Sequence, residues 1–127
     1  MNNLLSLLGR IGLSLIFIIS GCGKIAAYAG TQQYMESAGV PGALLPLVIL
    51  LELGGGLAVL SGLFTRWVAL ALAGFTLVAA VLFHANFADP MQAINFWKNV
   101  AIAGGFLMLA AGLPGAFSLD HLLQRKR

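Results

Sequence analysis

Four apolar segments, each near the length of a membrane-crossing helix, occupy most of this sequence. They cover residues 5–29, 43–64, 67–87 and 92–113, and a spanning helix needs about 20 mainly apolar residues. Backbone groups in hydrocarbon must satisfy one another, which leaves helices or a closed barrel. Because the segments lack the alternation of barrel strands, the sequence predicts an all-α transmembrane protein.

The composition excludes a water-facing surface. Of the 127 residues, 60% are hydrophobic and 9% are charged, whereas a soluble domain carries about 25% charged residues. Much of the formal charge of +3 comes from Arg125, Lys126 and Arg127, and no basic stripe is interleaved with aromatic residues. We therefore expect a lipid bilayer and no nucleic acid as partner, and a single domain over residues 1–127.

The connections between the segments are short, which predicts a four-helix up-down bundle. Arg10, Arg66 and the basic tail fall on one side of the membrane, and Lys24 and Lys98 fall on the other. Since cytoplasmic loops carry the excess of basic residues, five against two places both termini in the cytoplasm. In this interpretation Arg10 and Arg66 serve as topology determinants.

Capping residues mark the shorter elements. Thr31 is expected to begin a short helix that Gly39 ends, lying across the outer mouth of the bundle. Asp89, followed by a proline, predicts that the fourth helix begins near residue 90. Ser118 is expected to cap an interfacial helix over residues 118–126 on the inner leaflet.

Each predicted spanning helix carries a stripe of small or polar residues at helical spacing. Membrane helices use such stripes to approach one another closely. The stripes therefore predict that every helix turns its ionisable residue toward the bundle interior. Their members are Arg10, Ser14, Phe17, Gly21 and Lys24; Glu52, Gly55, Gly56 and Val59; Ala69, Ala73, Thr76, Ala80 and His84; and Lys98, Ala101, Gly105, Met108 and Gly112.

Glu52 is the ionisable residue that most needs a partner. It lies nine residues after Ala43, so roughly 14 Å below the outer surface, where a charge costs roughly 2.5–3.5 kcal/mol. The carboxylate is either ionised against Lys24 or Lys98, or protonated because desolvation disfavours the charged form. We favour the ion pair.

These residues define a candidate polar pocket that faces outward. Glu52 would form its floor, and His84, about 25 Å along the third helix, would lie at its rim with two lysines. The simpler alternative is structural: the lysines snorkel to the interface, His84 forms an ordinary hydrogen bond, and Glu52 fixes the helix register. The candidate residues are Lys24, Glu52, His84, Lys98 and Asn99, with Asn86 nearby.

Several other chemistries lack the residues they require. Cys22 follows a lipoprotein-like motif, but the apolar run continues past it, and without a second cysteine there is no C-x-x-C dithiol. His84 and His121 are expected on opposite membrane faces, so no metal site is predicted. No catalytic residue can be assigned.

Several short motifs are characteristic when taken together. They are Arg10-Ile-Gly-Leu, Ser20-Gly-Cys-Gly-Lys24, Gly30-Thr-Gln-Gln-Tyr34, Gly39-Val-Pro41, Leu51-Glu52-Leu-Gly-Gly-Gly56, Gly62-Leu-Phe-Thr-Arg66, Phe83-His84, Lys98-Asn99 and Gly104-Gly105. With them the chain resembles the DoxX family of small four-helix bacterial membrane proteins, most closely its short inner-membrane members. The resemblance implies a multi-pass inner-membrane location. It transfers no catalytic residues, although Lys24, Glu52, His84 and Lys98 match positions where the family is polar.

Three function classes remain open from the sequence. Some relatives of this kind are linked to membrane redox complexes, so the first class is a redox-associated subunit whose pocket meets a quinone headgroup or a membrane or periplasmic redox protein. The second is a small transporter or proton conductor with Glu52 as carrier, which would need a homo-oligomer because the chain holds no inverted repeat. The third is a non-catalytic membrane scaffold.

Overall fold

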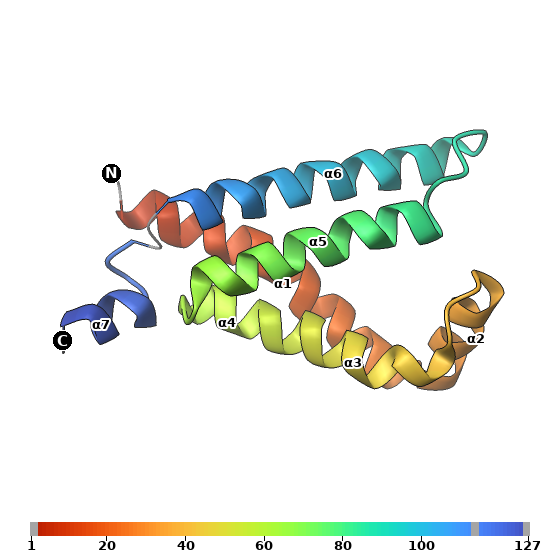
Figure 1. Ribbon diagram of the computed structural model, residues 1–127, viewed down its shortest axis with the longest axis horizontal. Coiled ribbons are helices and arrows are strands. Elements are labelled where there is room, and N and C mark those ends of the chain that lie inside the picture. Colours follow the sequence, from red (N-terminus) through yellow and green to blue (C-terminus); the bar gives the residue numbers. More distant parts are fainter. Residues whose placement is uncertain (1–2, 113–114, 126–127) are drawn as a thin grey trace.

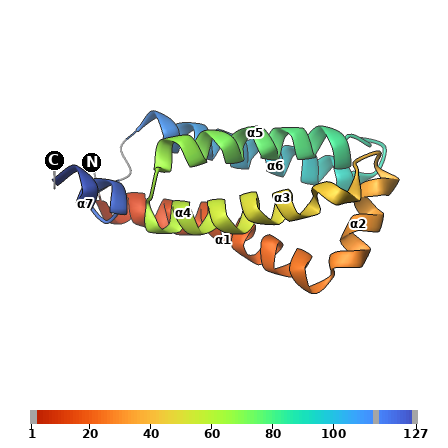
Figure 2. The ribbon, with the colours of Figure 1, turned by 60° about the horizontal axis from the view of Figure 1, so that its bottom comes forward.

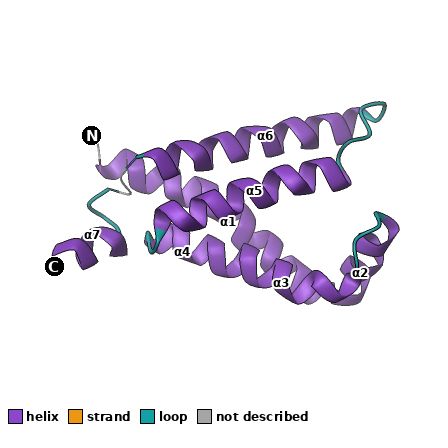
Figure 3. Ribbon diagram, in the orientation of Figure 1, coloured by secondary structure: helices purple, strands orange, loops and turns teal. Residues whose placement is uncertain are grey.

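The computed structural model describes residues 3–112 and 115–125, and every regular element in these ranges is helical (Figure 3). Residue 113, the predicted end of the fourth helix, and residue 126, the predicted end of the last, lie outside this part. The elements are α1 (Asn3–Ala26), α2 (Tyr28–Ser37), η1 (Gly42–Leu44), α3 (Leu45–Ile49), η2 (Leu50–Gly54), α4 (Gly55–Ser61), α5 (Thr65–Phe83), α6 (Pro90–Ala111) and α7 (Leu119–Arg125).

Within the described residues, four helices are long and apolar enough to cross a membrane, as the sequence predicts. They are α1, the continuous stretch Gly42–Ser61 that runs from η1 to α4, α5 and α6. The second of these contains a single π-helical turn, η2, between α3 and α4. Glu52 lies in that turn, at a type of helix irregularity that is common at functional sites.

The helices form two layers (Figure 2). One layer holds α5 and α6 packed along each other, and the other holds α1 packed along α3, η2 and α4. The layers contact each other mainly through α4 and α5, and to a smaller extent through α1 and α6. The start of α1 and α7 lie at one end of the molecule, and α2 lies at the other end (Figure 1).

The helix ends confirm three of the four predicted caps. Asp89 accepts a hydrogen bond from the Met91 amide at the start of α6, and Ser118 Oγ accepts one from the His121 amide in α7. Gly39 follows α2 with φ +82°, the left-handed conformation that ends helices. The predicted Thr31 cap is wrong: α2 begins three residues earlier, at Tyr28, because the chain passes almost directly into it from α1.

The first three predicted packing faces are confirmed. Every member of those stripes is buried except Lys24 and His84, which are half-buried. The fourth is wrong, since Lys98, Ala101, Met108 and Gly112 are exposed. Lipid and protein can both accommodate a stripe of small residues, so the larger apolar side chains decide how α6 is oriented. Its buried residues are Ala103, Phe106 and Ala110, and Phe106 meets Phe17 with ring centroids 5.4 Å apart.

Arg10 has a structural role that differs from the topology signal assigned to it. Its side chain is 1% exposed and donates to the carbonyls of Val59, at 3.2 Å, and Leu60, at 3.0 Å. It also donates to the carbonyl of Phe117 in the segment before α7. Arg10 therefore donates to carbonyls at the end of α4, where the Val59 carbonyl also accepts from the Gly62 amide, and holds the C-terminal segment against the bundle.

Candidate functional site

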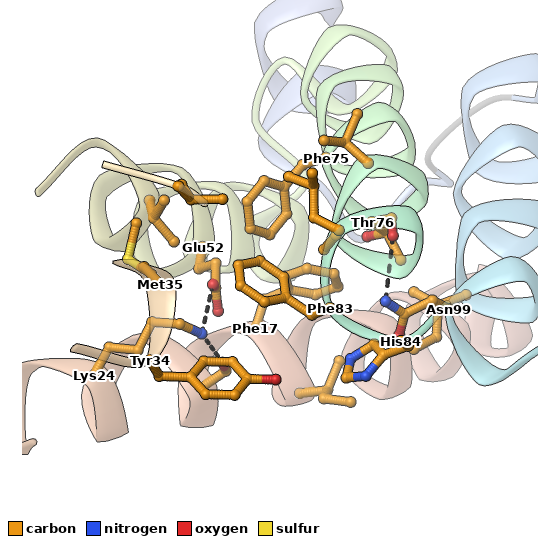
Figure 4. A pocket seen from close by; sticks show the side chains of 18 residues that line it. Phe17, Lys24, Tyr34, Met35, Glu52, Phe75, Thr76, Phe83, His84 and Asn99 are labelled. Atoms are coloured by element: carbon orange, nitrogen blue, oxygen red, sulfur yellow. Dashed lines mark hydrogen bonds and ion pairs between the residues drawn. The ribbon is translucent and has the colours of Figure 1, made fainter. Parts of the chain in front are cut away.

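A cavity of about 400 Å³ lies between the two helix layers, beneath α2 (Figure 4). Volumes of this size suit small organic ligands. Most of the lining is apolar, and the aromatic part comes from Phe17, Phe75 and Phe83. The polar side chains in the lining are Ser20, Lys24, Tyr34, Glu52, Thr76, His84 and Asn99.

An ion pair between Lys24 and Glu52 forms one side of the cavity. Lys24 Nζ lies 2.7 Å from Glu52 Oε1 and donates to Ser20 Oγ at 2.7 Å. The Glu52 side chain is 4% exposed and that of Lys24 is 26% exposed, and both residues line the cavity. The predicted pairing of Glu52 is thus confirmed, and Lys24 is the partner.

Glycines bring α1 close enough to η2 for this pair to form. A Cβ added to Gly21 would lie 3.1 Å from the backbone nitrogen of Leu53 and 3.2 Å from its Cα. A Cβ added to Gly56 would lie 2.8 Å from Ile18 Cγ1 and 3.2 Å from the Ser14 carbonyl oxygen. The two backbones are therefore nearly in contact, as small residues permit between membrane helices.

His84 lies at the end of α5 on the other side of the cavity. Its Nδ1 is 2.6 Å from Gln92 Oε1 at the start of α6. A carbonyl oxygen only accepts, so Nδ1 carries the proton and Nε2 is an acceptor in the neutral imidazole. Nε2 has no hydrogen-bond partner within the described part of the chain.

Asn99 supplies the other polar group on this side. Its Nδ2 donates to the backbone carbonyl of Thr76 at 3.2 Å and so connects α6 to α5. That bond uses one of the two amide N–H donors, and it leaves Oδ1 as an acceptor. Asn99 and His84 therefore both line the cavity (Figure 4).

Aromatic rings separate the two polar sides of the cavity. In Figure 4 the rings of Phe17 and Phe83 lie between the Lys24–Glu52 pair and the side that holds His84. On α2, Tyr34 stacks on Phe83 with ring centroids 5.3 Å apart and an interplanar angle of 20°. The geometry is that of an apolar, partly aromatic slot with hydrogen-bonding groups at both sides.

Two of the residues considered from the sequence lie outside this cavity. Lys98 is exposed and lines a separate shallow groove next to His84 and Asn99. Asn86 is exposed in the turn between α5 and α6. The structure therefore brings Lys24, Glu52, His84 and Asn99 to one cavity.

The sequence analysis did not identify Ser20, Tyr34 and Gln92 as site residues. Ser20 could have been found, because it lies four residues before Lys24 and hence on the same face of α1. Tyr34 reaches the site because of where α2 lies, and Gln92 because of the turn before α6. Helical periodicity predicts neither the position of α2 nor the path of that turn.

The comparisons with known proteins agree with this architecture. Residues 5–85 match the DoxX family model. Inner membrane protein YqjF of Escherichia coli (strain K12) is 59% identical over 120 residues, which is 94% of this chain and 92% of the relative. Inner membrane protein YphA of the same organism is 43% identical over 124 residues, or 92% of this chain and 89% of the relative.

CatD of Bacillus subtilis (strain 168), whose name includes the word oxidoreductase, is 35% identical over 77 residues, covering 61% of this chain and 57% of that protein. No solved structure matches the chain significantly. The family match and the two inner-membrane relatives confirm the resemblance that the sequence motifs indicate. The chain therefore belongs to the DoxX family and is an integral, multi-pass protein of the bacterial inner membrane.

Proposed function

We propose that this protein is a redox-associated membrane subunit whose cavity binds the headgroup of a quinone. The observation that carries the proposal is the distribution of hydrogen-bonding groups around the aromatic slot. Lys24 has three N–H donors, of which Glu52 and Ser20 engage two. Its third donor is available to a quinone carbonyl on that side of the cavity.

The opposite side offers groups of both kinds. The second amide N–H of Asn99 can donate to the other quinone carbonyl, and the free Nε2 of His84 can accept from a quinol hydroxyl. A site that serves a quinone and its quinol needs both a donor and an acceptor. The oxidoreductase name of CatD supports this function class over the other two.

We further propose that the helices form an up-down bundle with both termini in the cytoplasm, so that the cavity end of the molecule lies toward the periplasm. Five basic residues, Arg10 and Arg66 among them, then fall on the cytoplasmic side. A C-terminal fusion to a fluorescent protein that matures only in the cytoplasm should fluoresce. A dark but full-length, membrane-inserted fusion would contradict this topology.

A redox protein in the membrane or periplasm is the proposed electron partner, because a quinone and its quinol differ by two electrons and two protons, and the electrons need a donor or acceptor. The partner would dock at the cavity end, where α2 contributes Tyr34 and Met35 to the lining. Assembly of this chain into a homo-oligomer is proposed only for the alternative transport function.

Quinone binding by the purified protein in nanodiscs tests the proposed function. Wild type should bind a long-chain quinone and its quinol, and His84→Ala should weaken binding of the quinol at least tenfold, as loss of the hydrogen bond from its hydroxyl in a desolvated site would do. His121→Ala, a histidine substitution in α7 at the other end of the molecule, is the matched control and should bind like wild type.

Other results would favour the alternative classes. Absence of quinone binding together with a proton flux in proteoliposomes that Glu52→Gln abolishes would replace the proposal with proton conduction. Absence of both, with His84→Ala changing only the unfolding midpoint, would favour a scaffold.

A further inference from the structure

A groove on the outer surface of the seam between α1 and α6 shares a wall with the cavity. The two have Ile16, His84, Asn99 and Ile102 in common. Ile16 is 51% exposed, so this residue faces both the cavity and the surroundings of the bundle. α1 packs far less extensively on α6 than on α4, which makes this seam a weakly sealed side of the cavity.

We propose that this groove is a lateral access route from the bilayer, and that it holds the apolar tail of the ligand whose headgroup occupies the cavity. The inference rests on the proposed function and extends it by specifying the ligand class: an amphipathic molecule with a flat, oxygen-bearing headgroup and a hydrocarbon tail. Lipid-soluble molecules reach the site without crossing the aqueous phase. The exposed apolar residues along the seam are then covered by lipid and by the tail of the ligand.

The groove also carries an uncompensated positive charge. Lys98 lines it beside Asn95, and its side chain is exposed. Lys98 has no hydrogen-bond or ion-pair partner among residues 3–112 and 115–124. In these ranges the ion pair is formed by Lys24 and Glu52. The neutralised pair inside the cavity adds no net charge.

A headgroup bound in the cavity next to the wall shared with this groove therefore lies in a net positive field. Oxygen acceptors with negative charge are favoured there, because hydrogen bonds from an ammonium to a charged acceptor are stronger than those to a neutral one. Lys98, which lies outside the cavity lining, becomes a specificity-determining residue for headgroups that carry an ionised hydroxyl next to a carbonyl.

Blocking the groove tests the access route. Ala101 is exposed and lines the groove, whereas Ala111 is exposed on the same helix and lines neither the groove nor the cavity. In nanodiscs, Ala101→Phe should weaken binding of a long-chain quinone at least tenfold compared with Ala111→Phe. Binding of the same quinone headgroup without its tail should be the same in both variants.

Each result separates the inference from the proposed function. Equal binding of the long-chain quinone by Ala101→Phe and Ala111→Phe, with wild type binding normally, overturns the lateral route and leaves the proposed function intact. If Ala101→Phe weakens both probes to the same extent, the groove affects headgroup binding and not tail binding, which contradicts a tail in the groove. If wild type binds neither probe, the proposed function fails and the inference fails with it.

The charge is tested with two tail-less probes, a hydroxynaphthoquinone that is an anion at neutral pH and its uncharged parent. Wild type should prefer the anion by about two- to fivefold, the range that an exposed charge interaction gives. Lys98→Gln should remove this preference and Lys98→Arg should keep it. An unchanged preference in Lys98→Gln would show that Lys98 does not select the headgroup.

Discussion

At the scale of single residues, two buried charged side chains determine the structure of this protein in different ways. Arg10 has almost no exposed surface and donates to carbonyl oxygens of α4 and of the segment before α7. Glu52 is equally inaccessible, but its partner is a lysine that borders a cavity. The first arrangement joins parts of the fold, and the second leaves a polar group available to a ligand.

Arg10→Met should destabilise the protein by roughly 2–4 kcal/mol, because the carbonyls of Leu60 and Phe117 would lose their donor and that of Val59 would lose one of two. The free energy of unfolding in detergent measures the effect. Arg66→Met removes the same charge from an exposed side chain and should change stability by less than about 0.5 kcal/mol. Equal effects of the two substitutions would contradict the structural role of Arg10.

Glu52→Gln and Lys24→Met should each destabilise the protein by about 1–3 kcal/mol, because each leaves a charged or polar partner unmatched. The double variant should lose less than the sum, with a coupling energy of about 1 kcal/mol or more. A double-mutant cycle on unfolding free energies measures the coupling. Strict additivity would mean that the two side chains do not interact in the membrane.

These residues could be predicted only as far as the evidence for them lies within a single helix. Lys24 and Glu52 were found because each continues a stripe at helical spacing on a helix whose buried face the sequence reveals. The choice of Lys24 over Lys98 as the partner depends on which helices pack together. That choice follows from long-range contacts, which a single sequence does not encode locally.

At the scale of the helices, close approach between α1 and η2 positions the ion pair. Gly21→Ala would place a methyl group against the Leu53 backbone, where neither helix can yield without separating. The expected loss is about 1–3 kcal/mol, typical of overpacking. Gly23→Ala, on the same helix with open space around it, should be neutral or stabilise by up to about 1 kcal/mol. Thermal unfolding in detergent compares the two, and equal midpoints would contradict the close approach.

The orientation of α6 shows where periodicity is insufficient. Its sequence offers one stripe through Ala101 and Met108 and another through Ala103, Phe106 and Ala110. Because lipid tails are as apolar as a protein core, burial of small residues gives no clear free-energy preference in a membrane. The edge-to-face contact of Phe106 with Phe17 and the Asn99 bond to α5 are consistent with the observed choice.

At the scale of the whole molecule, the two layers separate beneath α2 and enclose a cavity rather than a continuous core. The apolar core lies between them at Val59, Leu72 and Phe106, and the polar groups gather toward α2. The spans and the existence of an interior polar region could be predicted from composition and spacing. The cavity itself could not, because it depends on how far α1 diverges from α5 and on where α2 crosses.

Identifying the lipid-soluble molecules that copurify from native membranes tests this account most directly. Ala79 lines the cavity, and Ala71 is exposed on the same helix outside it. Mass spectrometry should find a quinone in near-equimolar amount with wild type and with Ala71→Phe. It should find little with Ala79→Phe, whose larger side chain fills the cavity. The same quinone-to-protein ratio in all three preparations would contradict the account, because the molecule would then be bound elsewhere.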